Sequence, residues 1–161
     1  MMQTDVKSFH ATASGVVYNG RTRLKGVVIS PSTSVTYNST VSDTAGALSG
    51  TYSFSGSTTG TVTIVNHGLT TGQRVALDFT TGSGIDDAYV VTVVDADTFT
   101  IVDTVLTTSG NVTMYPKILI ELDCSTGTSF YTLIPGEGIV ATEGMVVTLP
   151  SASVTMTGFY G

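Results

Sequence analysis

The hydrophobic pattern of this chain stops near its middle and starts again, and this break constrains the fold more than any other feature. Apolar residues that alternate with polar ones restart at Val62, and a further apolar run begins at Ile118. Alternation with a period of two is typical of half-buried β-strands. We therefore expect a β module, residues 57–112, inserted into a host β domain formed by residues 1–56 and 113–161.

Turn residues divide the rest of the chain into short apolar runs. Asn19-Gly20 lies between two such runs and predicts a hairpin with a type I′ turn, which needs positive φ at both central residues. The segment 135–138, Pro-Gly-Glu-Gly, predicts a compact turn, and the apolar run after it indicates a strand rather than the helix that a phosphate-binding glycine loop requires. The sequence predicts an all-β fold, an antiparallel β-sandwich host domain with an inserted small β-barrel-like domain.

Charged residues are scarce, and the negative ones concentrate in the insert. They make up 11% of the chain, against about 25% in an average soluble domain. Within 57–112, six aspartates and one arginine account for about five of the six net negative charges. The aspartates are Asp78, Asp86, Asp87, Asp95, Asp97 and Asp103. We expect a displayed acidic module suited to presentation or contact.

Most of the basic residues lie near the start of the chain. Arg21, Arg23 and Lys25 alternate along one predicted strand and therefore project from one face of it. That face is either a docking site for an acidic partner subunit or an ordinary solvated strand face. The net charge of −6 argues against nucleic acid as the partner, because phosphate contacts require clustered Lys and Arg.

No residue pattern predicts a catalytic, cofactor-binding or metal site. Cys124 is the only cysteine, which excludes an intrachain disulfide and a zinc site of paired thiolates. His10 and His67 lie in separate segments, and we expect the ring of His67 to brace the turn before Gly68 through a backbone hydrogen bond. The acidic turn 95–97 lacks the spacing of a calcium loop. We expect no enzyme activity, no cofactor and no bound metal.

The sequence carries no membrane or secretion signal that we can identify. No apolar stretch approaches the ~20 residues that a membrane span needs. Residues 1–15 lack the apolar centre of a signal peptide. We expect a protein made in a host cytoplasm that does not contact membranes.

The outer parts of the chain resemble a small structural protein of tailed bacteriophages, especially marine and cyanobacterial ones. The matching segments are TASG at 12–15, RTRLKG at 21–26, ILIELD at 118–123, LIPGEGI at 133–139 and SVTMTGFYG at 153–161. In that group the two outer parts run together with a shorter middle. The resemblance implies an insertion and a location in the virion.

The middle part resembles a different module, which recurs in phage tail and fibre proteins and is similar to a β-rich domain of ubiquitin-activating enzymes. The matching segments are HGLTTG at 67–72 with Val75, YVV at 89–91 and TFTI at 98–101. These are turn and core patterns. They imply a fold and a virion setting, and they carry over no catalytic residue.

Three hypotheses about function follow. The first is a non-enzymatic virion structural protein, a capsid decoration or cement subunit that binds the major capsid protein, as a homo-oligomer such as a trimer. The second is a tail fibre, tail tip or adaptor component that binds tail proteins. The third is a glycan-binding or hydrolytic receptor module, in which two carboxylates would meet in a cleft about 5 to 10 Å apart. The available carboxylates are Glu121, Asp123, Glu137 and Glu143.

Overall fold

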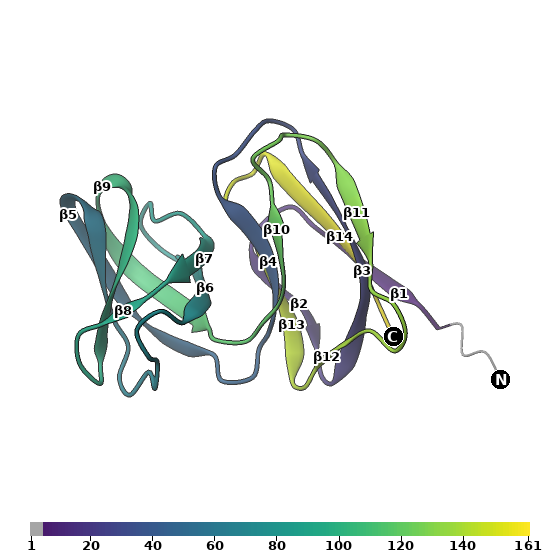
Figure 1. The fold of residues 1–161 in the computed structure, drawn as a ribbon, viewed down its shortest axis with the longest axis horizontal. Helices are drawn as coiled ribbons and strands as arrows, with labels where there is room; N and C mark the ends of the chain where they lie inside the picture. Colours follow the sequence, from purple (N-terminus) through teal and green to yellow (C-terminus); the bar gives the residue numbers. More distant parts are fainter. Residues whose placement is uncertain (1–4) are drawn as a thin grey trace.

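The computed structural model describes residues 5–161, and all regular structure in this range is β-strand (Figure 1). Fourteen strands form three antiparallel sheets within these residues. The predicted all-β class is confirmed. Two of the sheets face each other as a sandwich, and the third forms a separate curled body beside them (Figure 1).

The sheets are named here by their place in the molecule. The outer sheet has the order β1 (Lys7–Ala11), β14 (Val154–Tyr160), β3 (Thr22–Pro31) and β11 (Phe130–Leu133), with β12 (Ile139–Ala141) also on β3. The middle sheet has the order β10 (Ile118–Asp123), β4 (Asn38–Asp43), β13 (Gly144–Thr148) and β2 (Gly15–Asn19). The insert sheet has the order β5 (Leu48–Thr63), β9 (Thr98–Tyr115), β6 (Arg74–Asp78) and β7 (Asp87–Val90), with β8 (Thr92–Val93) on β9.

The outer and middle sheets form the sandwich and share one core. Leu24 and Met156 of the outer sheet are fully buried against Val41 and Met145 of the middle sheet. Strand alternation produces this arrangement, because every second residue of each strand points inward. Burial of a large aliphatic side chain contributes about 2 kcal/mol, so this core is a main source of the sandwich's stability.

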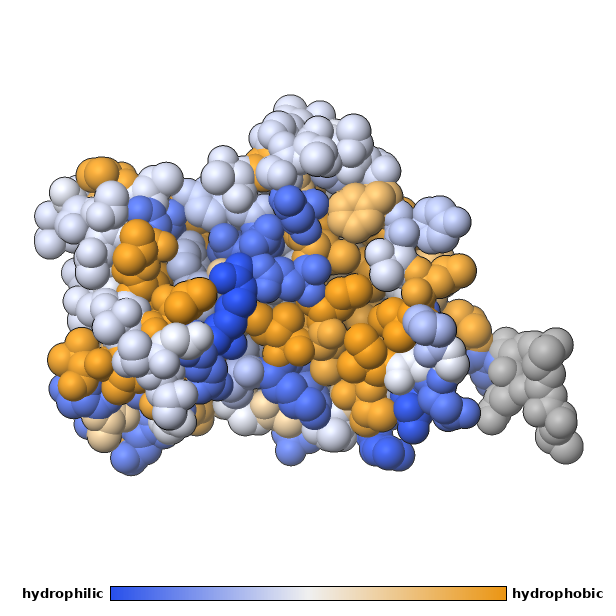
Figure 2. Space-filling view, viewed as in Figure 1, coloured by the Kyte–Doolittle hydropathy of each residue, from blue (hydrophilic) through white to orange (hydrophobic). Residues whose placement is uncertain are grey.

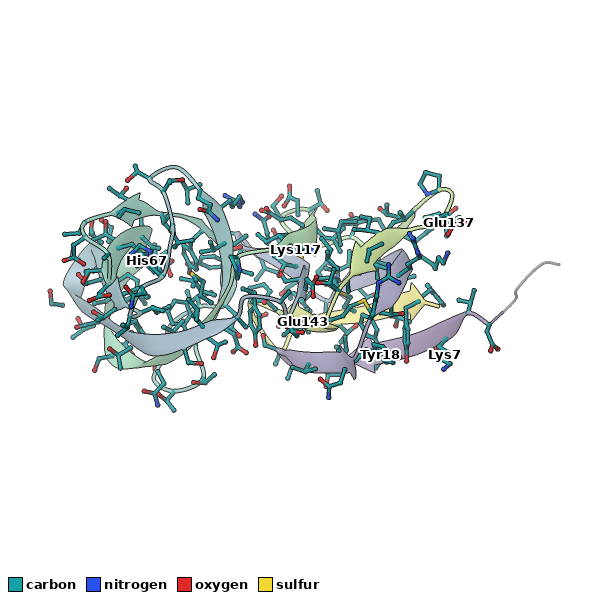
Figure 3. The ribbon with its side chains drawn as sticks, turned by 90° about the horizontal axis from the view of Figure 1, so that it is seen from below. Lys7, Tyr18, His67, Lys117, Glu137 and Glu143 are labelled. Carbon is teal, nitrogen blue, oxygen red and sulfur yellow. The ribbon has the colours of Figure 1, made fainter. Side chains whose placement is uncertain are left out.

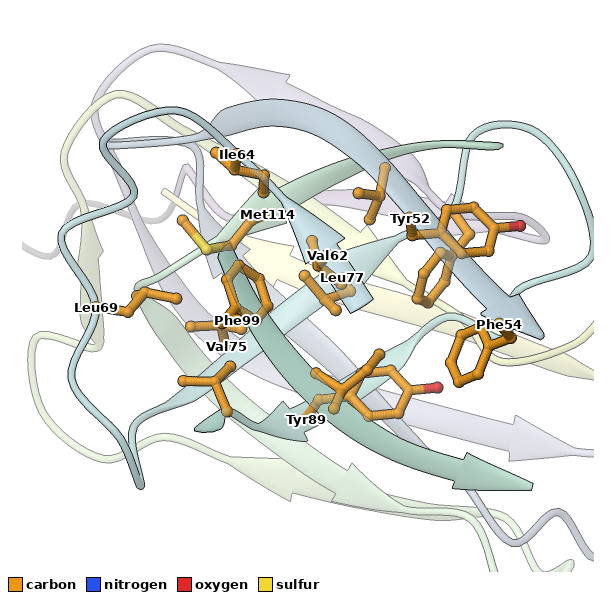
Figure 4. Close-up of a cluster of buried hydrophobic side chains, with 14 residues drawn as sticks. Tyr52, Phe54, Val62, Ile64, Leu69, Val75, Leu77, Tyr89, Phe99 and Met114 are labelled. Atoms are coloured by element: carbon orange, nitrogen blue, oxygen red, sulfur yellow. The ribbon is translucent and has the colours of Figure 1, made fainter. Parts of the chain in front are cut away.

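The insert sheet curls around its own core. Strands β5 and β9 pair along almost their whole length, and the ribbon that they form bends back on itself. Two glycines permit the bend: a Cβ at Gly50 would clash with the backbone of Thr63, and a Cβ at Gly60 would clash with the ring of Phe54. Figure 3 shows the curl end-on, and Figure 4 shows the enclosed side chains, among them Phe99.

The insert sheet extends beyond the predicted insert at both ends. Strand β5 already begins at Leu48 and β9 ends only at Tyr115, so residues 57 and 112 fall inside strands. Tyr52 and Phe54, which the sequence assigns to the host domain, are buried in the core of the insert sheet. We propose junctions near residues 48 and 115, and the division into two domains stays a prediction.

A β-bulge lies at the predicted start of the insert. The pairing register of β5 with β9 shifts between Ser55 and Ser57, and Gly56 between them has a φ of 75°. A bulge interrupts the inward–outward alternation without ending the strand. The break in the hydrophobic pattern therefore coincides with a bulge inside β5, and the pairing of β5 with β9 continues on both sides of it.

The predicted Asn19-Gly20 hairpin is wrong. Strand β2 pairs with β13 in the middle sheet, whereas β3 pairs with β14 in the outer sheet. Gly20 has a φ of 115°, but Asn19 is not in the positive-φ region that a type I′ turn requires. The amide of Gly20 donates to the carbonyl of Glu143 at 2.7 Å, so the turn carries the chain from one layer of the sandwich to the other.

The two central strands of the middle sheet, β4 and β13, are buried on both faces. All residues of β13 are buried, and in β4 only Asn38 is partly exposed. The face of the middle sheet that points away from the sandwich core packs against the insert sheet, where Val146 contacts Ala76 and Tyr115. The insert is therefore a third layer on the sandwich, rather than a module displayed on a loop (Figure 1).

Asp43 lies at the root of the insert sheet, where the chain leaves the sandwich and returns to it. Its side chain is fully buried and forms an ion pair with Lys117 at 2.7 Å. The carboxylate also accepts hydrogen bonds from Thr142 N and Oγ1 (both 2.7 Å), Glu143 N (3.2 Å) and Ala45 N (3.1 Å). Burial alone would raise the pKa of Asp43, but Lys117 and the other donors outweigh it and hold that pKa well below its usual range.

We expect Asp43→Asn to lower the free energy of unfolding by about 3 kcal/mol at pH 7, because it breaks a buried ion pair and leaves donors without an anionic acceptor. A carboxyl with a lowered pKa stabilises the fold above the unfolded value of about 3.9 and loses this effect as the pH falls. The difference between wild type and variant should therefore shrink below about pH 4. Urea denaturation at several pH values measures it.

Asp123→Asn is the matched control, because Asp123 is exposed and Asn retains the oxygen that accepts from the Ser125 amide. We expect that variant to change stability by less than about 0.5 kcal/mol. Equal losses in the two variants would contradict the role assigned to Asp43.

Candidate functional site

A hollow of about 320 Å³ lies at the end of the sandwich, between β1, the β2–β3 turn and the end of β14. We call it the basic hollow. Its charged lining residues are Lys7, Arg21, Arg23 and Asp5, and the rings of Tyr18 and Tyr160 form part of its wall. Figure 3 shows Lys7 and Tyr18 at the opposite end of the molecule from His67 of the insert.

The structure brings two of the three predicted docking residues into this hollow. Arg21 is exposed in the turn before β3, and Arg23 follows on the strand. Lys25 does not line the hollow, because its ammonium group donates to the backbone carbonyl of Glu137 at 2.8 Å. Arg23 Nε lies 3.8 Å from the side-chain carboxylate of Glu137. This ion pair is exposed, so it restrains the guanidinium of Arg23 only weakly. The docking role itself stays a prediction.

Lys7 is the basic residue of the hollow that the strand-alternation argument misses. It lies on β1, which pairs with β14, and β14 in turn pairs with β3. Lys7 and Arg21 form no ion pair within residues 5–161. The tyrosine rings beside them lie 4.8 Å apart between centroids. Three cationic side chains and one acidic side chain around an open hollow favour a ligand that carries carboxylates or another anion.

The second polar region is the seam between the sandwich and the insert sheet. The sandwich donates to three aspartates of the insert: Ser14 Oγ to Asp86 at 2.6 Å, Asn38 N to Asp87 at 3.0 Å and Tyr37 OH to Asp103 at 2.9 Å. Arg74 forms a two-point ion pair with Glu121 across the same seam. On the face in Figure 2, a hydrophilic band separates the hydrophobic areas of the two bodies.

These contacts correct the expectation of a displayed acidic module. Asp86, Asp87 and Asp103 are turned toward the sandwich, where they accept hydrogen bonds. Only the turn with Asp95 and Asp97 leaves its carboxylates exposed, and both accept hydrogen bonds from backbone amides there. The insert uses much of its negative charge internally, so little of it is available to a partner.

Burial changes the ionisation of two seam carboxyls. It raises the pKa of Asp86 to about 6, although hydrogen bonds from Ser14 and Phe79 act in the opposite direction. It raises the pKa of Asp87 to about 6 as well, against hydrogen bonds from Ala88 and Asn38. The seam therefore gains charge as the pH rises toward neutrality.

The remaining candidate residues have local structural roles. The ring of His67 accepts from the Leu69 amide at 3.0 Å and donates to the Asp95 carbonyl at 3.1 Å, which confirms that it braces the turn. Burial raises the pKa of the Cys124 thiol, which lies 3.3 Å from Ser39 Oγ. Glu121 forms an ion pair with Arg74.

Within residues 5–161, no group of three His, Cys, Asp or Glu side chains is placed to hold a metal ion. No helix in this range could span a membrane.

No family model and no curated protein sequence matches this chain. Its fold is similar to part of the phage phi92 endosialidase, with a TM-score of 0.33 and 18% sequence identity. The similarity covers 81% of this chain and 20% of that one, so the chain spans about a fifth of the endosialidase's length. A marine or cyanobacterial source and a place in the virion stay predictions.

The expectation that the chain has no enzyme activity is corrected by this comparison. The similar structure is an enzyme by name, and it contains a β fold of this general kind. At this TM-score the likeness carries no conclusion about which activity, if any, the chain has.

We expect Asp86→Asn to flatten the dependence of stability on pH between about 4 and 6. A carboxyl whose pKa is raised on folding binds its proton more tightly in the folded state, so ionisation over this range lowers the free energy of unfolding. Asn retains an acceptor for the Phe79 amide and removes the charge. Urea denaturation in steps of pH measures the slope, and Asp123→Asn is the control, since the pKa of Asp123 is lowered. A wild-type slope in Asp86→Asn would contradict this account.

Proposed function

We propose that this chain is a structural component of a tailed-phage particle, which attaches through the basic hollow to an acidic surface of a neighbouring virion protein. The observation that carries the proposal is the convergence of Lys7, Arg21 and Arg23 on one hollow in which Asp5 provides the one acidic side chain. The resemblance of the outer segments to a phage structural protein supports the setting.

Charge makes such an attachment directional. The whole chain has a net charge of −6, so its other surfaces are repelled by an acidic partner. The basic hollow lies at the end away from the insert, so docking there would leave the insert sheet pointing away from the particle (Figure 3). Each contact would be modest, and many copies on a symmetric lattice would add up to a strong attachment.

The first location that we propose is the head surface, where the chain would act as a capsid decoration or cement subunit on the major capsid protein. An ion-poor surface, with 11% charged residues, favours a protein whose flanks are covered by neighbours. A homo-oligomer such as a trimer would provide that cover.

A second location is the tail, where the chain would be a fibre, tip or adaptor component. The resemblance of segments 67–72 and 98–101 to a module of tail and fibre proteins favours it. Copy number per particle separates the two locations. Hundreds of copies indicate the head surface, and a small multiple of three or six indicates the tail.

The docking surface is tested by co-sedimentation with particles that lack the protein. We expect the double variant Lys7→Gln and Arg21→Gln to bind at least about tenfold more weakly, equivalent to about 1.4 kcal/mol. Binding of the wild type should also weaken steeply between about 50 and 500 mM salt, because exposed charge contacts are screened.

Thr61→Glu is the control, because it makes the chain more negative at an exposed position on the insert sheet, outside the hollow. We expect that variant to bind within about twofold of wild type, since surface changes away from a contact have small effects. Unchanged binding of the double variant would contradict this docking surface. Wild-type affinity that does not change with salt concentration would also contradict it.

A further inference from the structure

A second and larger hollow, of about 590 Å³, opens at the seam between the sandwich and the insert sheet. We call it the seam hollow. Its lining includes Tyr37 from the sandwich and Arg74, Asp87, Tyr89, Val102 and Asp103 from the insert sheet. It shares no lining residue with the basic hollow. The volume is within the range of small-molecule sites and is large enough for one or two sugar rings.

Asp87 provides an acceptor that the protein itself leaves unused. The residue is 8% exposed, and its Oδ1 accepts from the amides of Asn38 at 3.0 Å and Ala88 at 2.6 Å. Its Oδ2 has no hydrogen-bond partner within residues 5–161, yet it is not sealed from solvent. A carboxylate oxygen in this position requires a donor from water or from a ligand.

Two tyrosines hold a second carboxylate of the hollow in a fixed orientation. Asp103 Oδ1 accepts from Tyr37 OH at 2.9 Å and from the Thr104 amide at 2.6 Å. Tyr89 OH lies 2.7 Å from Asp103 Oδ2 and shares its proton between that oxygen and the Ile85 carbonyl. Burial and the adjoining carboxylate raise the pKa of Tyr89, so its hydroxyl keeps its proton. An acceptor that is oriented in advance costs little further ordering when a ligand hydroxyl binds to it.

Arg74 also lines the hollow and can provide a donor. Its Nε and Nη2 are engaged by Glu121, which holds the guanidinium in place. Its Nη1 group has no hydrogen-bond partner within residues 5–161 and can donate to a ligand oxygen. Acceptors and a donor held in the lining of one hollow are suited to a polyol, because each hydroxyl both donates and accepts.

Apolar side chains complete the lining. Val90 and Val102 lie at the hollow and are 52% and 71% exposed, and the half-buried ring of Tyr37 is beside them. The faces of a sugar ring carry C–H groups, which pack favourably on apolar and aromatic surfaces. Exposed valines next to a polar hollow therefore fit a saccharide better than they fit a small inorganic ion.

The charge of the hollow selects among saccharides. Asp87 and Asp103 carry two negative charges, and the single cation, Arg74, is already neutralised by Glu121. An anionic sugar would meet like charge at short range, which costs binding energy. We infer that the seam hollow is a binding site for a neutral saccharide, held by its hydroxyls on Asp87 and Asp103 and by its C–H face on Val102 and Tyr37. This inference is independent of the docking proposed for the basic hollow.

The test uses saturation-transfer NMR and calorimetry on the full chain with four neutral probes, maltotriose, mannotriose, galactobiose and diacetylchitobiose, and with anionic sialyllactose as the comparator. We expect at least one neutral probe to bind with a Kd of about 1 mM or tighter and sialyllactose to bind at least tenfold more weakly. Asp87→Asn and Val102→Glu should each weaken the neutral probe at least tenfold, while Thr61→Glu, at an exposed position outside the hollow, leaves its binding unchanged.

Val102→Glu keeps the test decisive if Asp87→Asn loosens the seam, because Val102 is exposed and its replacement removes no core contact. Three results would overturn the inference. They are no binding of any neutral probe up to about 10 mM, binding that both variants leave intact, and sialyllactose binding as tight as that of the neutral probes.

Discussion

The buried carboxylate of Asp43 is the interaction on which the arrangement of the three sheets depends. It lies at the end of β4, just before the chain enters the insert sheet, and its ion pair with Lys117 holds the returning chain beside the departing one. Thr142 and Glu143, which precede β13, donate to the same carboxylate. One side chain therefore fixes the root of the insert to both central strands of the middle sheet.

The seam extends this attachment along the face of the middle sheet. Its apolar part is small, with Val146 packed on Ala76 and Tyr115, and its polar part consists of aspartates that accept from the sandwich. The two kinds of carboxylate respond to pH in opposite directions. The pKa of Asp43 is lowered and that of Asp86 is raised, so acid weakens the root, whereas ionisation toward neutral pH adds charge to the seam.

The all-β class, the turn braced by His67 and the turn at 135–138 could be predicted from the sequence, because alternation and turn chemistry are local properties. The ends of the insert sheet could not, since the bulge at Gly56 breaks the alternation inside a continuous strand. Asn19-Gly20 misleads for a related reason: local residues define a turn, but tertiary packing decides which sheet follows it.

The two hollows could not be predicted from local sequence patterns either, because contacts between distant parts of the chain form them. Ser14 meets Asp86 and Arg74 meets Glu121 across long stretches of chain, so the inward orientation of the acidic residues has no local signal. Lys7 joins Arg21 only through the pairing of β1, β14 and β3. Charge counts along the sequence described the insert correctly as acidic, but they did not show where that charge points.

Native-state hydrogen exchange on the intact chain, followed residue by residue by NMR in rising denaturant, tests most directly whether the insert sheet is a packed layer of the sandwich. If Asp43 and the seam hold the layers together, the amides of β4 and β13 should lose protection in the same opening as those of β6 and β7, at a free energy near that of global unfolding. An opening of the insert sheet at much lower free energy, with β4 and β13 still protected, would contradict this account.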